Sequence, residues 1–88
     1  MARVAFSDEA MWEFHHACSA ARRGDPYTVG PEPRVVVCEL ERAGWLWLKR
    51  RDVGGYWILP TAAGEAAAAR WVKRWADEYA LLFGAPLP

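Results

Sequence analysis

The sequence predicts a small α+β fold made of two helices, a β-hairpin and a long C-terminal helix. Apolar residues recur at helical spacing near both ends of the chain and in a short central run, while two aromatic-rich runs flank a pair of glycines. With 88 residues, 53% of them hydrophobic and six of them tryptophan, we expect a single domain over 1–88 with a dense core and not a disordered chain.

The first predicted helix covers 8–23 and follows a short tail, 1–6. Ser7 suits the N-cap because its hydroxyl can accept a hydrogen bond from a free backbone N–H, and two acidic residues follow at the positive end of the helix dipole. Gly24 and Pro26 end the helix. One face of it collects the apolar side chains Ala10, Met11, Phe14, Ala17, Cys18 and Ala21.

The second predicted helix covers 34–43. The preceding segment, 24–33, contains two glycines and three prolines and is expected to form turns. Pro33 stands where a proline opens a helix, and Gly44 closes it. Three consecutive valines would also suit a strand, but the Glu-Leu-Glu-Arg-Ala-Gly ending favours a helix.

A β-hairpin is predicted over 45–59, where the apolar period changes. The runs Trp-Leu-Trp-Leu-Lys-Arg-Arg and Tyr-Trp-Ile-Leu flank Asp-Val-Gly-Gly, a turn sequence. The base of this hairpin is apolar and its tip is charged. We therefore expect the base in the core and the tip in water.

The last predicted helix covers 62–83, with Thr61 as N-cap and Gly84 at its end. At about 1.5 Å per residue it would be about 33 Å long, against a radius of gyration of about 12 Å for a globule of this size. We therefore expect part of its aromatic face to meet a second subunit. The predicted dimer or partner interface consists of Trp12, Trp71, Trp75, Tyr79, Leu82 and Phe83.

Formal net charge is zero, which argues against a protein that coats nucleic acid indiscriminately. The first sixteen residues carry a net charge of −2 and those from Thr61 onward are balanced, so the middle of the chain is net positive. Any anion-binding surface is expected there.

Cys18 and Cys38 lie inside predicted helices without paired spacing, and we expect buried free thiols. No signal-like segment or membrane-spanning run is seen, so the expected setting is cytoplasmic, without membrane contact. Nine arginines against two lysines suggest a GC-rich bacterial or phage genome.

Two junctions resemble those of the winged helix-turn-helix regulators, especially the PadR and MarR groups. At 40–46 a leucine, three residues, a glycine and an apolar pair mark the end of the recognition helix, and at 59–64 Leu-Pro-Thr-Ala-Ala-Gly marks the exit from the wing. The similarity covers about 28–70 and implies a winged-helix fold. These families place a separate short helix before the recognition helix. The segment 24–33 leaves little room for one, so we expect a degenerate helix-turn-helix.

The leading hypothesis is a homodimeric transcriptional regulator that binds double-stranded DNA. The helix 34–43 would enter the major groove and the hairpin would contact phosphates. Glu39 and Glu41 oppose this role, and the alternative is a helix that serves mainly the core beside an ordinary solvated hairpin tip. The candidate DNA contacts are Lys49, Arg50 and Arg51 on the wing, Arg22 and Arg23 beside it, and Arg34 and Arg42 for base readout.

The second hypothesis is a winged-helix protein-protein interaction module. Trp12 falls on the polar side of the first helix, where it is either covered by the C-terminal helix or presented to a partner protein. Leu81 is similarly placed on the last helix. An enzyme is not expected: His15 and Cys18 have the spacing to share a metal, but no second ligand pair is visible, and we expect no catalytic residues, metal or cofactor.

Overall fold

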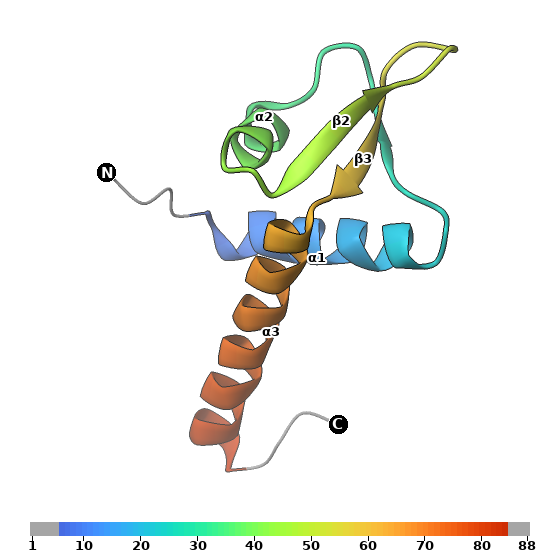
Figure 1. Cartoon of the computed structure of the whole chain (residues 1–88). Helices are drawn as coiled ribbons and strands as arrows, with labels where there is room; N and C mark the ends of the chain where they lie inside the picture. Colours follow the sequence, from blue (N-terminus) through green and yellow to red (C-terminus); the bar gives the residue numbers. More distant parts are fainter. Residues whose placement is uncertain (1–5, 85–88) are drawn as a thin grey trace.

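The computed structural model describes residues 6–84 and has an α+β architecture of three helices and a three-stranded antiparallel sheet (Figure 1). Apart from Phe6, the predicted N-terminal tail lies outside the described residues. The elements are α1 (Asp8–Arg22), β1 (Thr28–Val29), α2 (Val35–Arg42), β2 (Leu46–Arg50), β3 (Tyr56–Pro60) and α3 (Ala62–Phe83).

Hydroxyl caps fix the starts of both long helices, as the sequence predicts. Ser7 Oγ accepts a hydrogen bond from the N–H of Ala10 at 3.1 Å, and Thr61 Oγ1 accepts one from the N–H of Gly64 at 3.0 Å. Gly84 ends α3 with a φ of 67°, a left-handed conformation that glycine adopts without strain. The predicted bounds of these helices are confirmed to within one residue.

The predicted hairpin is confirmed as β2 and β3, which pair from Leu46↔Pro60 to Arg50↔Tyr56. Side chains alternate across such a ladder, so one face of the hairpin packs inward and the other points away from the helices. Leu46 and Ile58 are buried on the inward face, whereas Trp47 on the other face is 68% exposed.

Strand β1 was not predicted. It consists of two residues from the turn-rich segment, Thr28 and Val29, which pair with Trp57 and Tyr56 and place β3 in the centre of the sheet. Two residues are too few to show an alternating pattern, so periodicity cannot reveal such a strand. The hairpin turn comes so close to β1 that a Cβ added to Gly55 would lie 2.2 Å from the Val29 carbonyl oxygen.

The core lies between the inward face of the sheet and helices α1 and α2, and the start of α3 closes one side. Phe14 and Cys18 are the largest of its fully buried side chains. Gly64 allows close approach of α3, because a Cβ there would lie 1.9 Å from the Trp45 carbonyl oxygen and 2.8 Å from Phe14 Cζ. Besides Phe14 and Cys18, the core cluster consists of Ala17, Leu40, Leu46, Ile58 and Ala68.

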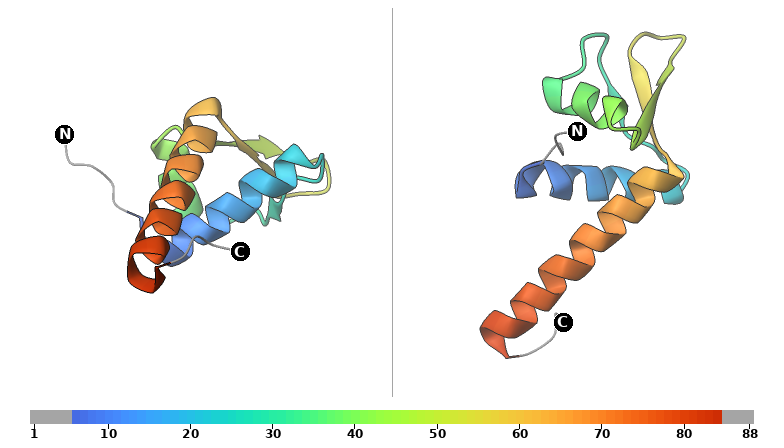
Figure 2. Two further views of the ribbon diagram at one scale, coloured as in Figure 1. Left: turned by 90° about the horizontal axis from the view of Figure 1, so that it is seen from below. Right: turned by 60° about the vertical axis from the view of Figure 1, so that its left-hand side comes forward.

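Helix α3 contacts α1 from Glu65 to Trp75, and its last turns extend away from the rest of the molecule (Figures 1 and 2). The radius of gyration is therefore 14.4 Å, above the value of about 12 Å for a compact chain of this length. In residues 6–84 no helix is both long and apolar enough to cross a membrane.

Candidate nucleic-acid interface

Basic side chains without ion-pair partners lie at the tip of the hairpin and at the end of α2, near the base of the hairpin. Lys49 and Arg50 at the end of β2 are exposed, as is Arg42 at the end of α2, and none of the three lies within salt-bridge distance of a carboxylate in residues 6–84. The hairpin tip and the loop before α2 lie at one end of the molecule, opposite the far end of α3 (Figure 2). Three cations therefore face solvent without compensation by the described carboxylates.

Arg51, the third predicted wing cation, is held against an aromatic ring. Its guanidinium carbon lies 4.8 Å from the centroid of Trp57, within the range of cation–π attraction. Its Nε is buried and donates to no acceptor among the described residues. Stacking therefore positions this guanidinium while leaving the donors on its other nitrogens unpaired with protein.

The predicted contacts Arg22 and Arg34 are already paired with carboxylates. Arg22 binds Glu65 at 3.0 Å and so joins α1 to α3, and Arg34, just before α2, binds Glu13 on α1. The hydrogen bond to Glu13 raises the pKa of Arg34. Both guanidinium groups connect helices in this structure, whereas Arg23 at the end of α1 is exposed and has no ion pair within 6–84.

Helix α2 offers a poor surface for reading base edges. Val37 and Leu40 are buried against the sheet, so the side chains left to solvent include Val35, Glu41 and Arg42. Glu39 is half-buried. An exposed valine and an acidic side chain supply no donors for the acceptor-rich edge of guanine, and the carboxylate repels phosphates.

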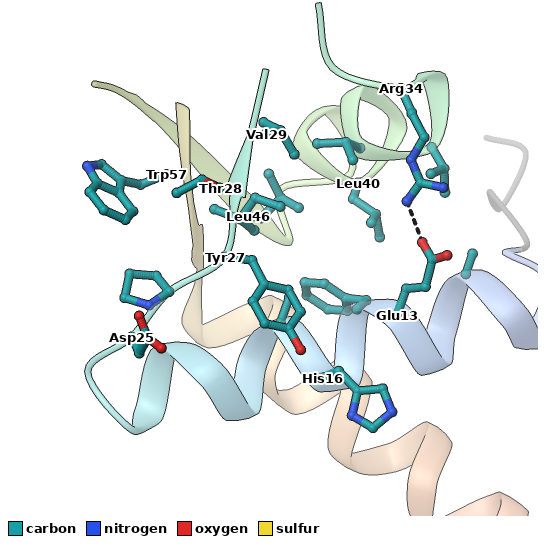
Figure 3. A pocket seen from close by; sticks show the side chains of 17 residues that line it. Glu13, His16, Asp25, Tyr27, Thr28, Val29, Arg34, Leu40, Leu46 and Trp57 are labelled. Atoms are coloured by element: carbon teal, nitrogen blue, oxygen red, sulfur yellow. Dashed lines mark hydrogen bonds and ion pairs between the residues drawn. The ribbon is translucent and has the colours of Figure 1, made fainter. Parts of the chain in front are cut away.

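A cavity of about 650 Å³ lies between α1, β1 and α2 (Figure 3). Its floor is the apolar core, and the Glu13–Arg34 ion pair lies on one side, with Tyr27 and His16 nearby. The volume falls within the range of small-molecule and peptide pockets, about 300–1,000 Å³. The sequence did not predict this cavity. It did predict that the segment 24–33, part of which lines the cavity, contains no helix.

The histidine and cysteine side chains of α1 form no reactive centre. Partial burial and the neighbouring His16 lower the pKa of His15, and burial raises the pKa of the Cys18 thiol to about 11. At neutral pH Cys18 is therefore a protonated core side chain and not a nucleophile. Cys38 is free but only half-buried, so the prediction of two buried thiols is wrong for Cys38.

The three tryptophans of the predicted dimer or partner interface pack together within the monomer. Trp12 contacts Trp71 and Trp75 edge-to-face, with ring centroids 4.8 and 5.2 Å apart. Trp71 is 7% exposed, and its Nε1 donates to Asp8 Oδ1 at 3.3 Å. The sequence leaves two placements for Trp12, covered by the C-terminal helix or presented to a partner protein. In the structure α3 covers it.

The rest of the predicted interface lies on the far half of α3. Tyr79 stacks between Trp75 and Phe83, and the side chain of Phe83 is 68% exposed. Leu81 and Leu82 are 85% and 78% exposed. This helix end carries apolar side chains that no other described element covers.

Comparisons with protein-family models, with curated proteins and with solved structures gave no match.

Proposed function

We propose that the protein is a winged-helix module that binds double-stranded DNA as a homodimer, as a small transcriptional regulator would. The order of helix, short strand, helix, hairpin and helix supports the winged-helix assignment, with β1 as the third strand beside the wing. The helix-turn-helix would be degenerate, because the segment between α1 and α2 contains a strand and bends where the regulators have a helix.

The observation that carries the proposal is the group of uncompensated cations at the hairpin tip. Elsewhere in residues 6–84 several basic side chains are paired: Arg22, Arg34, Lys73 and Arg74 all lie within 4.0 Å of a carboxylate oxygen. Lys49 and Arg50 are adjacent in sequence and unpaired, and Arg51 follows them. A protruding hairpin with three consecutive basic residues suits contact with a phosphate backbone.

Most of the binding free energy would then come from phosphates and little from base edges. Arg42 at the end of α2 is the remaining candidate for base readout, because Arg34 is held by Glu13. Glu41 lies next to Arg42 and is exposed. We therefore expect weak sequence preference and strong dependence on salt.

A dimer joined through the far half of α3 would carry two hairpins, each at the end of its protomer opposite that interface. A two-fold pair presents the same surface twice, so the apolar end of α3 would cover its own copy. Such a dimer would bind half-sites about 34–36 Å apart, one turn of DNA, if its two wings enter the same face of the duplex.

The test of this proposal compares two double variants that remove equal charge. In the wing variant, Lys49→Ala is combined with Arg50→Ala, and in the control Lys73→Ala is combined with Arg74→Ala on α3. Binding of a labelled random-sequence duplex is measured across a salt series. The slope of log affinity against log salt is negative. We expect the wing variant to make it shallower by about 1.8 per protomer, and the control to leave it unchanged. Equal slopes for wild type and wing variant would contradict the proposal.

The cavity favours a second candidate function, a protein-interaction module. The regulators have a helix before the recognition helix, and here an apolar-floored hollow lies before α2, so an amphipathic helix of a partner protein is the occupant that suits it. Val36 lines the cavity, whereas the adjacent Val35 is 73% exposed and does not. A partner recovered from host lysate by wild type and Val35→Asp, but not by Val36→Asp, would support this function. Recovery of the same partner by wild type, Val35→Asp and Val36→Asp would exclude the cavity as the site of partner binding.

A further inference from the structure

The outward face of the sheet combines exposed aromatic and basic side chains. Because Leu46 and Ile58 point inward, their neighbours along each strand point to the opposite face. The outward residues are Thr28 on β1, Trp47 and Lys49 on β2, and Trp57 and Leu59 on β3. None of these five is acidic, and Trp47 is 68% exposed.

The strand register places these side chains close together. Lys49 lies directly opposite Trp57, and Trp47 lies opposite Leu59. Trp47 and Trp57 are therefore diagonal neighbours on adjacent strands, with Cα atoms about 7–8 Å apart. The register therefore places two tryptophans and a lysine on the same face of the hairpin.

Arg51 adds a positioned cation to this surface. Its guanidinium stacks on Trp57 at 4.8 Å, makes no hydrogen bond to protein in residues 6–84, and leaves its Nε without an acceptor. An exposed tryptophan in a chain this small has no role in the core. The stacked arginine has no carboxylate to bind among the described residues, so its guanidinium is free to bind an anion.

We infer that this face, Trp47, Lys49, Arg51 and Trp57, is a binding site for single-stranded nucleic acid. Unpaired bases stack on aromatic side chains of sheets, and neighbouring basic groups bind the intervening phosphates. The exposed ring of Trp47 is the stacking platform, and Lys49 and Arg51 are the phosphate contacts. The site shares Lys49 and Arg51 with the proposed duplex contact, but it differs in requiring the aromatic side chain of Trp47, which the duplex contact does not use.

A stacking contact and a phosphate contact give different signatures in a salt series. Loss of one stacked base costs between about fivefold and about a hundredfold in affinity and leaves the salt slope unchanged, because no counterion is released by stacking. Loss of one phosphate contact to a single strand makes the slope of log affinity against log salt shallower by about 0.7. We expect the first result for Trp47→Ala and the second for Lys49→Ala.

The experiment measures anisotropy of a labelled oligothymidylate of about twelve nucleotides, a length within the usual site sizes for single strands. It uses wild type, Trp47→Ala, Trp47→Phe and the control Val35→Ala, which removes an equally exposed apolar side chain from α2. We expect the affinity of Trp47→Ala to fall within the stated range, with Trp47→Phe and Val35→Ala close to wild type. Thermal melts of all four should coincide, because both positions are exposed.

The same proteins titrated with duplex separate this inference from the proposed function. Unchanged duplex binding by Trp47→Ala together with weaker single-strand binding supports the site. If Trp47→Ala binds the single strand as tightly as wild type does, the inferred site is wrong, even if duplex binding persists. Absence of binding to both probes at low salt overturns both proposals.

Discussion

Replacing Gly64 by alanine tests the contact that joins α3 to the rest of the fold. The backbone of Gly64 is helical, so alanine is conformationally allowed there and would favour an isolated helix. The obstacle is steric: the new Cβ would lie 1.9 Å from the Trp45 carbonyl oxygen and 2.8 Å from Phe14 Cζ. Because the first of these atoms belongs to the backbone, α3 itself has to move by about 1 Å to restore even the shortest normal contact.

The free-energy change follows from three contributions. Overpacking of this kind costs about 1–3 kcal/mol. Moving α3 also weakens the hydrogen bond from the Thr61 N–H to the Trp45 carbonyl oxygen, 2.9 Å long, at a further cost of about 1 kcal/mol. The higher helix propensity of alanine returns at most about 1 kcal/mol. We expect Gly64→Ala to lower the free energy of unfolding by about 1–3 kcal/mol, which corresponds to a fall in Tm of roughly 5–25 °C.

Urea unfolding followed by tryptophan fluorescence measures this change directly. The matched control is Gly30→Ala, since an added Cβ at Gly30 meets no atom within 4 Å and its φ is not positive. We expect the control to be as stable as wild type or slightly more so. A Gly64→Ala protein that unfolds at the same urea concentration as the control would refute the packing of α3 against the Trp45 carbonyl.

Three further predictions follow from the same structure. Thr61→Ala removes the donor to the Gly44 carbonyl oxygen and the acceptor at the start of α3, so we expect a loss of about 1–2 kcal/mol in urea unfolding, with Thr61→Ser close to wild type. Cys18, with its thiol pKa raised to about 11, should react with iodoacetamide at pH 8 far more slowly than the half-buried Cys38, and equal rates by mass spectrometry would place Cys18 outside the core. Leu82→Asp combined with Phe83→Asp should convert a dimer to a monomer in sedimentation equilibrium without lowering Tm measured at low protein concentration, and an unchanged mass would remove this helix end from the interface.

The elements with strong local signals were predictable from the sequence. Ser7 and Thr61 fix the starts of their helices through bonds to residues three positions later, so the sequence contains all the information for those two ends. The hairpin was evident because the change of apolar period, the two aromatic-rich runs and the glycine pair are also local. The short strand β1 has no signal of its own, since it exists only because Tyr56 and Trp57 on β3 provide its partners.

The candidate site was predictable in its composition but not in its pairing. Sequence alone identifies the basic residues of the hairpin, but it cannot show which arginines meet a carboxylate distant in the chain. The Arg22–Glu65 ion pair joins residues that are 43 positions apart, and it forms only because α1 and α3 pack together. The exposed face of β2 was likewise missed, because the side chain direction of Trp47 depends on which of its neighbours the core buries.

Anisotropy of a labelled random-sequence duplex, measured from low to moderate salt with the wild-type protein, tests duplex binding most directly. Phosphate contacts by Arg42, Lys49, Arg50 and Arg51 predict binding at low salt and a slope of log affinity against log salt of about −3 to −4 for each protomer. No binding at low salt, or an affinity that does not change with salt, would contradict the proposal that the hairpin binds double-stranded DNA.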